Sequence, residues 1–157
     1  ASIVAWAGHY WQAGLLFIAG SLLDALDGGV ARLTGAVSKA GAALDSSLDR
    51  VAEAALFIAL LTGSAAKEYP SLVYAASLAM TGSFMVSYVR ARAEGLGIPC
   101  EVGFFTRMER LIVMIAALFL ADMVGSFMLL LACMLVALGA WGTALQRLLT
   151  VFRASTL

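Results

Sequence analysis

Charged residues are scarce in this sequence of 157 residues, and their scarcity excludes an ordinary soluble domain. They make up 13% of the chain, whereas about a quarter is typical of soluble domains. Hydrophobic residues reach 62%, and the mean hydropathy is +0.96. These values favour a polytopic membrane protein. The ten basic and ten acidic residues cancel, and no basic stripe alternates with aromatic residues, so we expect no nucleic-acid partner.

Histidine and cysteine are rarer still. His9 is the only histidine in the sequence, which excludes a metal site built from several imidazoles. Cys100 and Cys133 lie far apart and form neither a metal-binding nor a redox spacing, so we expect two inert thiols. A metal site in this protein would therefore have to use oxygen ligands.

Apolar segments separated by short polar breaks occupy most of the chain. Most of them approach or exceed the ~20 residues needed to cross a bilayer, where irregular backbone is not tolerated against lipid. We therefore expect an all-α, polytopic transmembrane helix bundle that forms a single domain over residues 1–157. Residues 1–8 look like the end of a span whose start is missing. Further spans are expected at about 11–32, 40–61, 74–88, 111–121 and 124–149.

The basic residues predict the orientation of these spans. When the spans are threaded alternately, every lysine and arginine except Lys67 falls at or near one face. Cytoplasmic loops carry such an excess of positive charge. We therefore expect a multi-pass protein of the cell membrane, with this face in the cytoplasm.

Four aspartates interrupt the apolar segments. A carboxylate in the centre of a membrane helix costs at least ~2.5–3.5 kcal/mol, so such residues are functional candidates. Asp24 and Asp27 are three residues apart, and Asp45 and Asp49 are four apart, so each pair shares one face of its helix. The short connection makes the two helices antiparallel neighbours. We expect all four carboxylates to converge on one pocket near the cytoplasmic face.

Four converging carboxylates repel one another unless cations lie between them. Oxygen ligands without histidine or cysteine indicate Mg²⁺ or Mn²⁺, and we expect two ions whose coordination is completed by a substrate phosphate. Gly28 and Gly41 would leave room for a ligand, Ala31 keeps the same surface small, and Arg32 supplies a positive charge. Glu53, one turn beyond Asp49, is expected to pair with a nearby arginine.

Residues 24–49 read D-x2-D-G-x2-A-R-x8-G-x3-D-x3-D. This pattern is similar, at every fixed position, to the signature of the CDP-alcohol phosphatidyltransferase family. The resemblance implies that family's six-helix bundle, with its first helix truncated here. It implies that Asp24, Asp27 and Asp45 are metal ligands and that Asp49 lies by the metals as the general base. It also implies CDP-lipid contacts at four further positions: Gly28, Ala31, Arg32 and Gly41.

Two downstream segments resemble the phosphatidylinositol-phosphate synthase branch of that family. Residues 87–94 read S-Y-V-R-A-R-A-E, and residues 103–110 read G-F-F-T-R-M-E-R. In that branch a basic pocket holds the phosphate of inositol phosphate, which implies acceptor phosphate-binding roles for Arg90, Arg107 and Arg147. The sequence departs from the branch pattern where Arg90 replaces lysine and Met108 replaces proline.

The interpretation that follows is a transferase of phospholipid biosynthesis. It would take a CDP-lipid, such as CDP-diacylglycerol, from the cytoplasmic leaflet and transfer the phosphatidyl-type group to inositol phosphate, releasing CMP. A phosphatidylglycerophosphate synthase, or an enzyme using another acceptor, remains an alternative within the family. Two alternatives come from other classes. A cation- or proton-coupled membrane transporter would have its acidic residues spread across the depth of the membrane, and a non-catalytic membrane scaffold would be unaffected by Asp49→Asn. The resemblance also makes a homodimer plausible.

Overall fold

The computed structural model describes the backbone of residues 1–33 and 38–155, and the side chains of residues 1–23 and 38–154. Every element within these ranges is a helix, which confirms the all-α prediction. The helices are α1 (Ser2–Trp6), α2 (Tyr10–Leu33), α3 (Lys39–Thr62), α4 (Ser64–Glu68), α5 (Ser71–Gly95), α6 (Arg107–Val124) and α7 (Phe127–Ser155).

Two helices of the described chain have the length and apolar character of membrane spans. They are α5 and the Phe127–Ala154 part of α7, while Tyr10–Leu23 of α2 is apolar but shorter. Large apolar side chains also cover the outside of the bundle: Leu138 is 75% exposed and Phe152 66% exposed. Such an outer surface suits a bundle surrounded by lipid.

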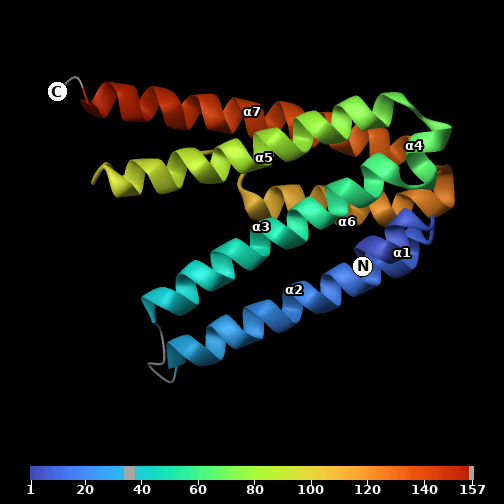
Figure 1. Ribbon diagram of the computed structural model, residues 1–157, viewed down its shortest axis with the longest axis horizontal. Helices are drawn as coiled ribbons and strands as arrows, with labels where there is room; N and C mark the ends of the chain where they lie inside the picture. Colours follow the sequence, from blue (N-terminus) through green and yellow to red (C-terminus); the bar gives the residue numbers. More distant parts are fainter. Residues whose placement is uncertain (34–37, 156–157) are drawn as a thin grey trace.

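The long helices form one elongated bundle (Figure 1). Helices α5 and α7 pack against each other along much of their length, α6 lies beside α7 and α2, and α3 lies beside α5. The short helices α1 and α4 gather at one end. There Gly63 makes the turn from α3 to α4, and a Cβ at this position would lie 2.8 Å from the carbonyl oxygen of Trp6. A glycine therefore allows α1 to approach this turn closely.

Small side chains let α5 and α7 pack closely. Ala76 and Ala79 of α5, and Cys133 and Val136 of α7, are completely buried in one apolar core. Further along α5, a Cβ at Gly82 would lie 2.9 Å from the Trp141 ring. The Trp141 indole nitrogen donates to the carbonyl oxygen of Leu78 at 3.1 Å.

The connection between α5 and α6 folds back onto α7. A Cβ on Gly139 would lie 2.5 Å from the Phe105 ring, so the aromatic ring packs directly on the α7 backbone. The Phe105 amide donates to Thr143 Oγ1 at 3.1 Å. Because α6 begins two residues later, α7 fixes the place where α6 starts.

Helix α6 then begins with a stabilised first turn. The Thr106 amide donates to Glu109 Oε2 at 2.8 Å, and the Thr106 hydroxyl donates to the same oxygen. The bond from the amide is one half of a capping box, and the other half is the Thr106 side chain accepting from the Glu109 amide. Both hydrogen bonds to Glu109 Oε2 stabilise the ionised carboxylate, and the bond from the Thr106 hydroxyl contributes most to lowering the pKa of Glu109. Residues Arg107 and Arg110 are thereby held in the ordered first turn of α6.

Candidate active site

The acidic residues of α3 line up along one side of the helix. Asp45, Asp49 and Glu53 follow one another at intervals of four residues, which is close to one helical turn. Asp45 is exposed, whereas the side chains of Asp49 and Glu53 are each only 14% exposed. The helix begins after Ser38, whose hydroxyl accepts a hydrogen bond from the Gly41 amide at 3.0 Å. This cap stabilises the turn that precedes the acidic row.

Two arginines of α6 face this acidic row. Arg107 forms an ion pair with Asp49. Arg110 donates from Nε to Glu53 Oε1 at 2.9 Å and from Nη2 to Glu53 Oε2 at 3.4 Å. The Arg110 residue is 2% exposed, and its Nη1 also contacts the carbonyl oxygen of Phe105 at 3.5 Å. The expected pairing of Glu53 with a nearby arginine is confirmed.

A third arginine connects the acidic row with α5. Arg50 donates from Nη1 to Ser87 Oγ at 2.8 Å. Its Nη2 lies 3.6 Å from Asp49 Oδ2, and its Nε lies 4.0 Å from Glu53 Oε2. The two carboxylates therefore lie within a network of three guanidinium groups that joins α3 to both α5 and α6.

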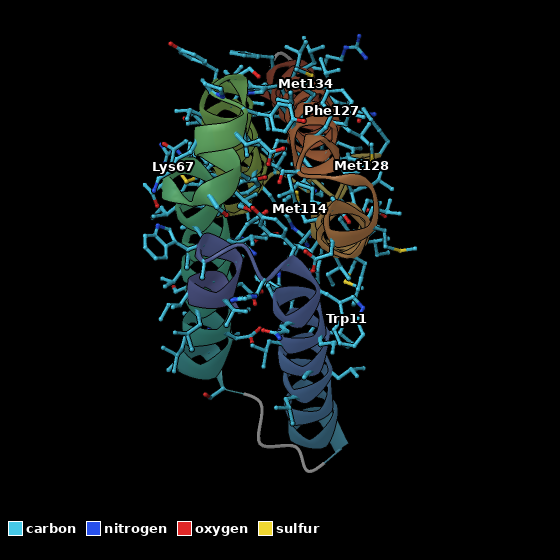
Figure 2. All side chains as sticks on the ribbon, turned by 90° about the vertical axis from the view of Figure 1, so that its right-hand side faces the viewer. Trp11, Lys67, Met114, Phe127, Met128 and Met134 are labelled. Atoms are coloured by element: carbon cyan, nitrogen blue, oxygen red, sulfur yellow. The ribbon has the colours of Figure 1, made fainter. Side chains whose placement is uncertain are left out.

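A cavity of about 330 Å³ opens next to this network, between α2, α3 and α6. Its charged part is formed by Asp49, Glu53, Arg107 and Arg110. Met114 of α6 also lines it and points into the interior of the bundle (Figure 2). The cavity suits a ligand with a charged end and an apolar end. Its remaining apolar lining includes Leu16, Phe17, Leu48, Leu56, Phe57 and Leu111.

A second hollow, of about 590 Å³, lies on the other side of α3, against α5. Arg50 and Ser87 form part of its wall, as do Arg90 and Glu94. Because Asp49 lines the first cavity and Arg50 lines this groove, consecutive residues of α3 face the two spaces. We call this second hollow the α3–α5 groove. Its other lining residues are Ser46, Ser47, Phe84, Tyr88 and Ala91.

Of the four aspartates expected to cluster, the structure describes the side chains of two, Asp45 and Asp49. Asp24 and Asp27 lie outside the described side chains, as do the expected CDP-lipid contacts Gly28, Ala31 and Arg32. Helices α2 and α3 do run antiparallel (Figure 1), and both line the cavity next to Asp49. Among the side chains that the structure describes, no group of three metal-binding residues occurs. The convergence of the four carboxylates stays a prediction.

The three arginines expected to bind the acceptor phosphate have different surroundings. Arg90 is exposed and its Nε lies 2.8 Å from Glu94 Oε1. Arg107 lines the cavity and pairs with Asp49. Arg147 is 4% exposed and donates to the carbonyl oxygens of Val102 and Val86, both at 2.7 Å. Their joint role in phosphate binding stays a prediction.

Sequence reasoning gave no site role to Arg50, Ser87 or Arg110. Spacing gave a signal for two of them: Arg110 lies one turn beyond Arg107, and Ser87 lies one turn before Arg90. This spacing places both residues on the face of a functional candidate, but it does not identify the partner on the other helix.

Comparison with known proteins identifies the family. The family model described as CDP-alcohol phosphatidyltransferase matches residues 1–151. The chain is 39% identical, over 137 residues, to an archaetidylinositol phosphate synthase of Pyrococcus horikoshii, covering 86% of this chain and 66% of that protein. It is 39% identical, over 110 residues, to a phosphatidylinositol phosphate synthase of Mycobacteroides abscessus, covering 69% of this chain and 50% of that protein. The chain thus spans about half to two thirds of the length of these two relatives.

Solved structures of one related protein have the same fold. The phosphatidylinositol phosphate synthase PgsA1 of Mycobacterium tuberculosis, in a crystal structure with CDP-DAG bound, is 32% identical with a TM-score of 0.81, covering 97% of this chain and 81% of that chain. Another PgsA1 structure, in complex with manganese and citrate, is 31% identical with a TM-score of 0.79, covering 97% and 77% of the two chains. The chain belongs to the CDP-alcohol phosphatidyltransferase family.

Proposed function

We propose that this membrane protein transfers a phosphatidyl-type group from a CDP-lipid to inositol phosphate and releases CMP. The observation that carries the proposal is the cavity between α2, α3 and α6, which has Asp49 at its charged end and an apolar lining elsewhere. A CDP-lipid has the same division into a charged head and an apolar tail. Family membership and the names of the relatives support the same reaction.

The oxygen-only donor set on α3 fits a divalent cation. Asp45 and Asp49 present two carboxylates one turn apart, and Gly20 and Ser21 of α2 line the same cavity as Asp49. Asp24 follows Gly20 by one helical turn along α2. We propose that Asp24, Asp27, Asp45 and Asp49 hold two Mg²⁺ or Mn²⁺ ions, which when bound neutralise the pyrophosphate and stabilise the leaving CMP. The manganese complex of PgsA1 supports this choice of metal.

Asp49 is the proposed general base. Its carboxylate would accept the proton of the acceptor hydroxyl while that oxygen attacks the β-phosphorus of the CDP-lipid. Arg107 and Arg50 contact this carboxylate from two directions. These contacts would hold its oxygens in place during proton transfer. We further propose that Gly28, Ala31, Arg32 and Gly41 contact the CDP group.

The residues of the α3–α5 groove suit an acceptor that carries a phosphate. Arg50, Arg90 and Ser87 give its wall two guanidinium groups and a hydroxyl, which are suitable donors for a phosphate. The adjacent positions of Asp49 and Arg50 would allow an acceptor held in the groove to direct its hydroxyl toward Asp49. We propose Arg90, Arg107 and Arg147 as the residues that bind the acceptor phosphate; Arg90 lines this groove, whereas Arg107 lines the first cavity. We propose that the site faces the cytoplasm, because the basic residues predict that this face of the membrane protein is cytoplasmic. We also propose that the protein forms a homodimer.

Release of CMP by the purified protein tests the proposal. The protein in detergent is supplied with CDP-diacylglycerol, Mg²⁺ or Mn²⁺, and one of four acceptors: inositol phosphate, glycerol 3-phosphate, serine or inositol. We expect release with inositol phosphate alone, and its loss when EDTA removes the metal.

Asp49→Asn should abolish CMP release, whereas the matched variant Glu68→Gln should retain it, since Glu68 is exposed on α4. Release with glycerol 3-phosphate instead would assign a phosphatidylglycerophosphate synthase. No release with any acceptor, or full activity of Asp49→Asn, would overturn the proposed reaction.

A further inference from the structure

Helices α3 and α6 are joined by two ion pairs, which follow the same order along both helices. Asp49 pairs with Arg107, and Glu53, one turn later on α3, pairs with Arg110, one turn later on α6. The two pairs therefore form successive connections between the helices. Only the first of them involves the proposed general base.

The two connections differ in burial. The side chain of Arg107 is 36% exposed, whereas that of Arg110 is 2% exposed. Arg110 uses two of its nitrogens on Glu53 and a third on the carbonyl oxygen of Phe105. It therefore connects α3 both to α6 and to the residue just before the α6 cap. A guanidinium with several simultaneous partners fixes direction as well as distance.

We propose that Glu53 and Arg110 are positioning residues for the reaction. Their pair sets the height and rotation of the first turn of α6 against α3, so that Arg107 meets the carboxylate of Asp49 at the charged end of the cavity. The inference rests on the proposed function, because it assigns the pair a role in aligning the proposed base. Both residues line the cavity, but the role proposed for them is exerted through Asp49 and Arg107.

Arg110→Lys is the informative variant. Lysine keeps the positive charge but has one terminal nitrogen, so it cannot satisfy both Glu53 oxygens and the Phe105 carbonyl together. We expect kcat for CMP release to fall about tenfold or more, while KM for the CDP-lipid changes little. The melting temperature should fall because buried oxygens lose a hydrogen-bond donor, with the protein still folded at the assay temperature. Arg92→Lys is the matched control, since Arg92 is exposed on α5, and it should leave kcat unchanged.

A double-mutant cycle separates positioning from a merely structural role. If Arg110 acts through Arg107, then Arg110→Lys should reduce kcat in the natural background but have little further effect when Arg107 is already glutamine. Independent effects would multiply in the double variant, and that result would overturn the inference. A kcat equal to that of the unaltered protein in Arg110→Lys would do the same.

Cross-linking provides a readout that does not depend on activity. In an Asp49→Cys/Arg107→Cys protein, a short bifunctional thiol reagent should join the two introduced cysteines, while the native Cys100 and Cys133 are buried. Adding Arg110→Lys should lower the yield severalfold, and adding Arg92→Lys should not. An unchanged yield would contradict the positioning role even if the protein proved inactive toward CDP-lipids. Lack of CMP release with a normal cross-linking response would instead reject the proposed function alone.

Discussion

The contact between Gly139 and Phe105 predicts a strong effect from the smallest possible substitution in α7. In Gly139→Ala, the new methyl group would lie 2.5 Å from Phe105 Cδ1 and 2.6 Å from Cγ. Carbon atoms in ordinary contact are about 3.5–4.0 Å apart, so the ring has to move by about 1 Å. The Phe105 amide is held by Thr143, and the displacement would therefore pass to the start of α6.

Gly139→Ala should reduce both stability and activity. Overpacking of this kind costs about 1–3 kcal/mol, measurable by denaturant or thermal unfolding in detergent. A displacement of about 1 Å at the α6 start, which carries Arg107, should also reduce CMP release by up to about a hundredfold. A second substitution, Phe105→Leu, replaces the ring with a smaller side chain and should restore part of the lost stability and part of the lost activity.

Gly95→Ala is the matched control for this prediction. A Cβ at Gly95, near the end of α5, would have no neighbour within 4 Å. This variant should therefore be as stable as the natural protein, or slightly more stable because alanine favours the helix. If Gly139→Ala is as stable and as active as the natural protein, or if Gly95→Ala loses as much, the packing argument is refuted.

Three further predictions concern the helices around the site. Leu118→Ala should cost about 2–5 kcal/mol in unfolding experiments because Leu118 is fully buried, whereas Leu120→Ala, at a side chain that is 43% exposed, should cost clearly less. Asp122→Asn should destabilise the protein by about 0.3–1 kcal/mol because Asp122 Oδ2 accepts from the Trp11 amide near the start of α2. Because the pKa of Glu109 is lowered, the stability contributed by its carboxylate is complete above the ordinary value of 4.5 and is lost as the pH falls through the lowered value. The unfolding free energy of Glu109→Gln, measured across this acidic range, should therefore lack the part of the pH dependence that Glu109 contributes.

Most helices could be predicted from hydropathy, but their ends required more information. The expected spans 11–32 and 40–61 agree closely with α2 and α3, whereas the span expected at 74–88 is the longer helix α5, Ser71–Gly95. Hydropathy falls where charged residues such as Arg90 and Glu94 begin, yet the backbone stays helical and the two side chains pair on its surface. Helix α7 begins at Phe127, later than the expected start at 124, because Gly125, with φ of +119°, interrupts the helix.

The site could be predicted where its residues share one helix, and less well where they meet across helices. The four-residue spacing predicts correctly that Asp49 and Glu53 lie on one side of α3. The choice of Arg110 as the partner of Glu53 depends on how α6 packs, and several other arginines were available in the sequence. Arg147 could not be foreseen as a donor to two backbone carbonyls, because one contact depends on how α7 packs against α5 and the other on the path of the connection at Val102.

The buried pair between Glu53 and Arg110 has a consequence for how the protein is assembled. A carboxylate at the centre of a membrane helix costs about 2.5–3.5 kcal/mol, and Glu53 lies near the middle of α3. The two residues are separated by 57 positions in the sequence, so α3 is synthesised well before its neutralising partner. Until α6 arrives, Glu53 lacks Arg110 and has only the more distant Arg50 of its own helix, whose Nε lies 4.0 Å from Glu53 Oε2. We therefore expect α3 to reach its final place in the bundle only after α6 has been inserted.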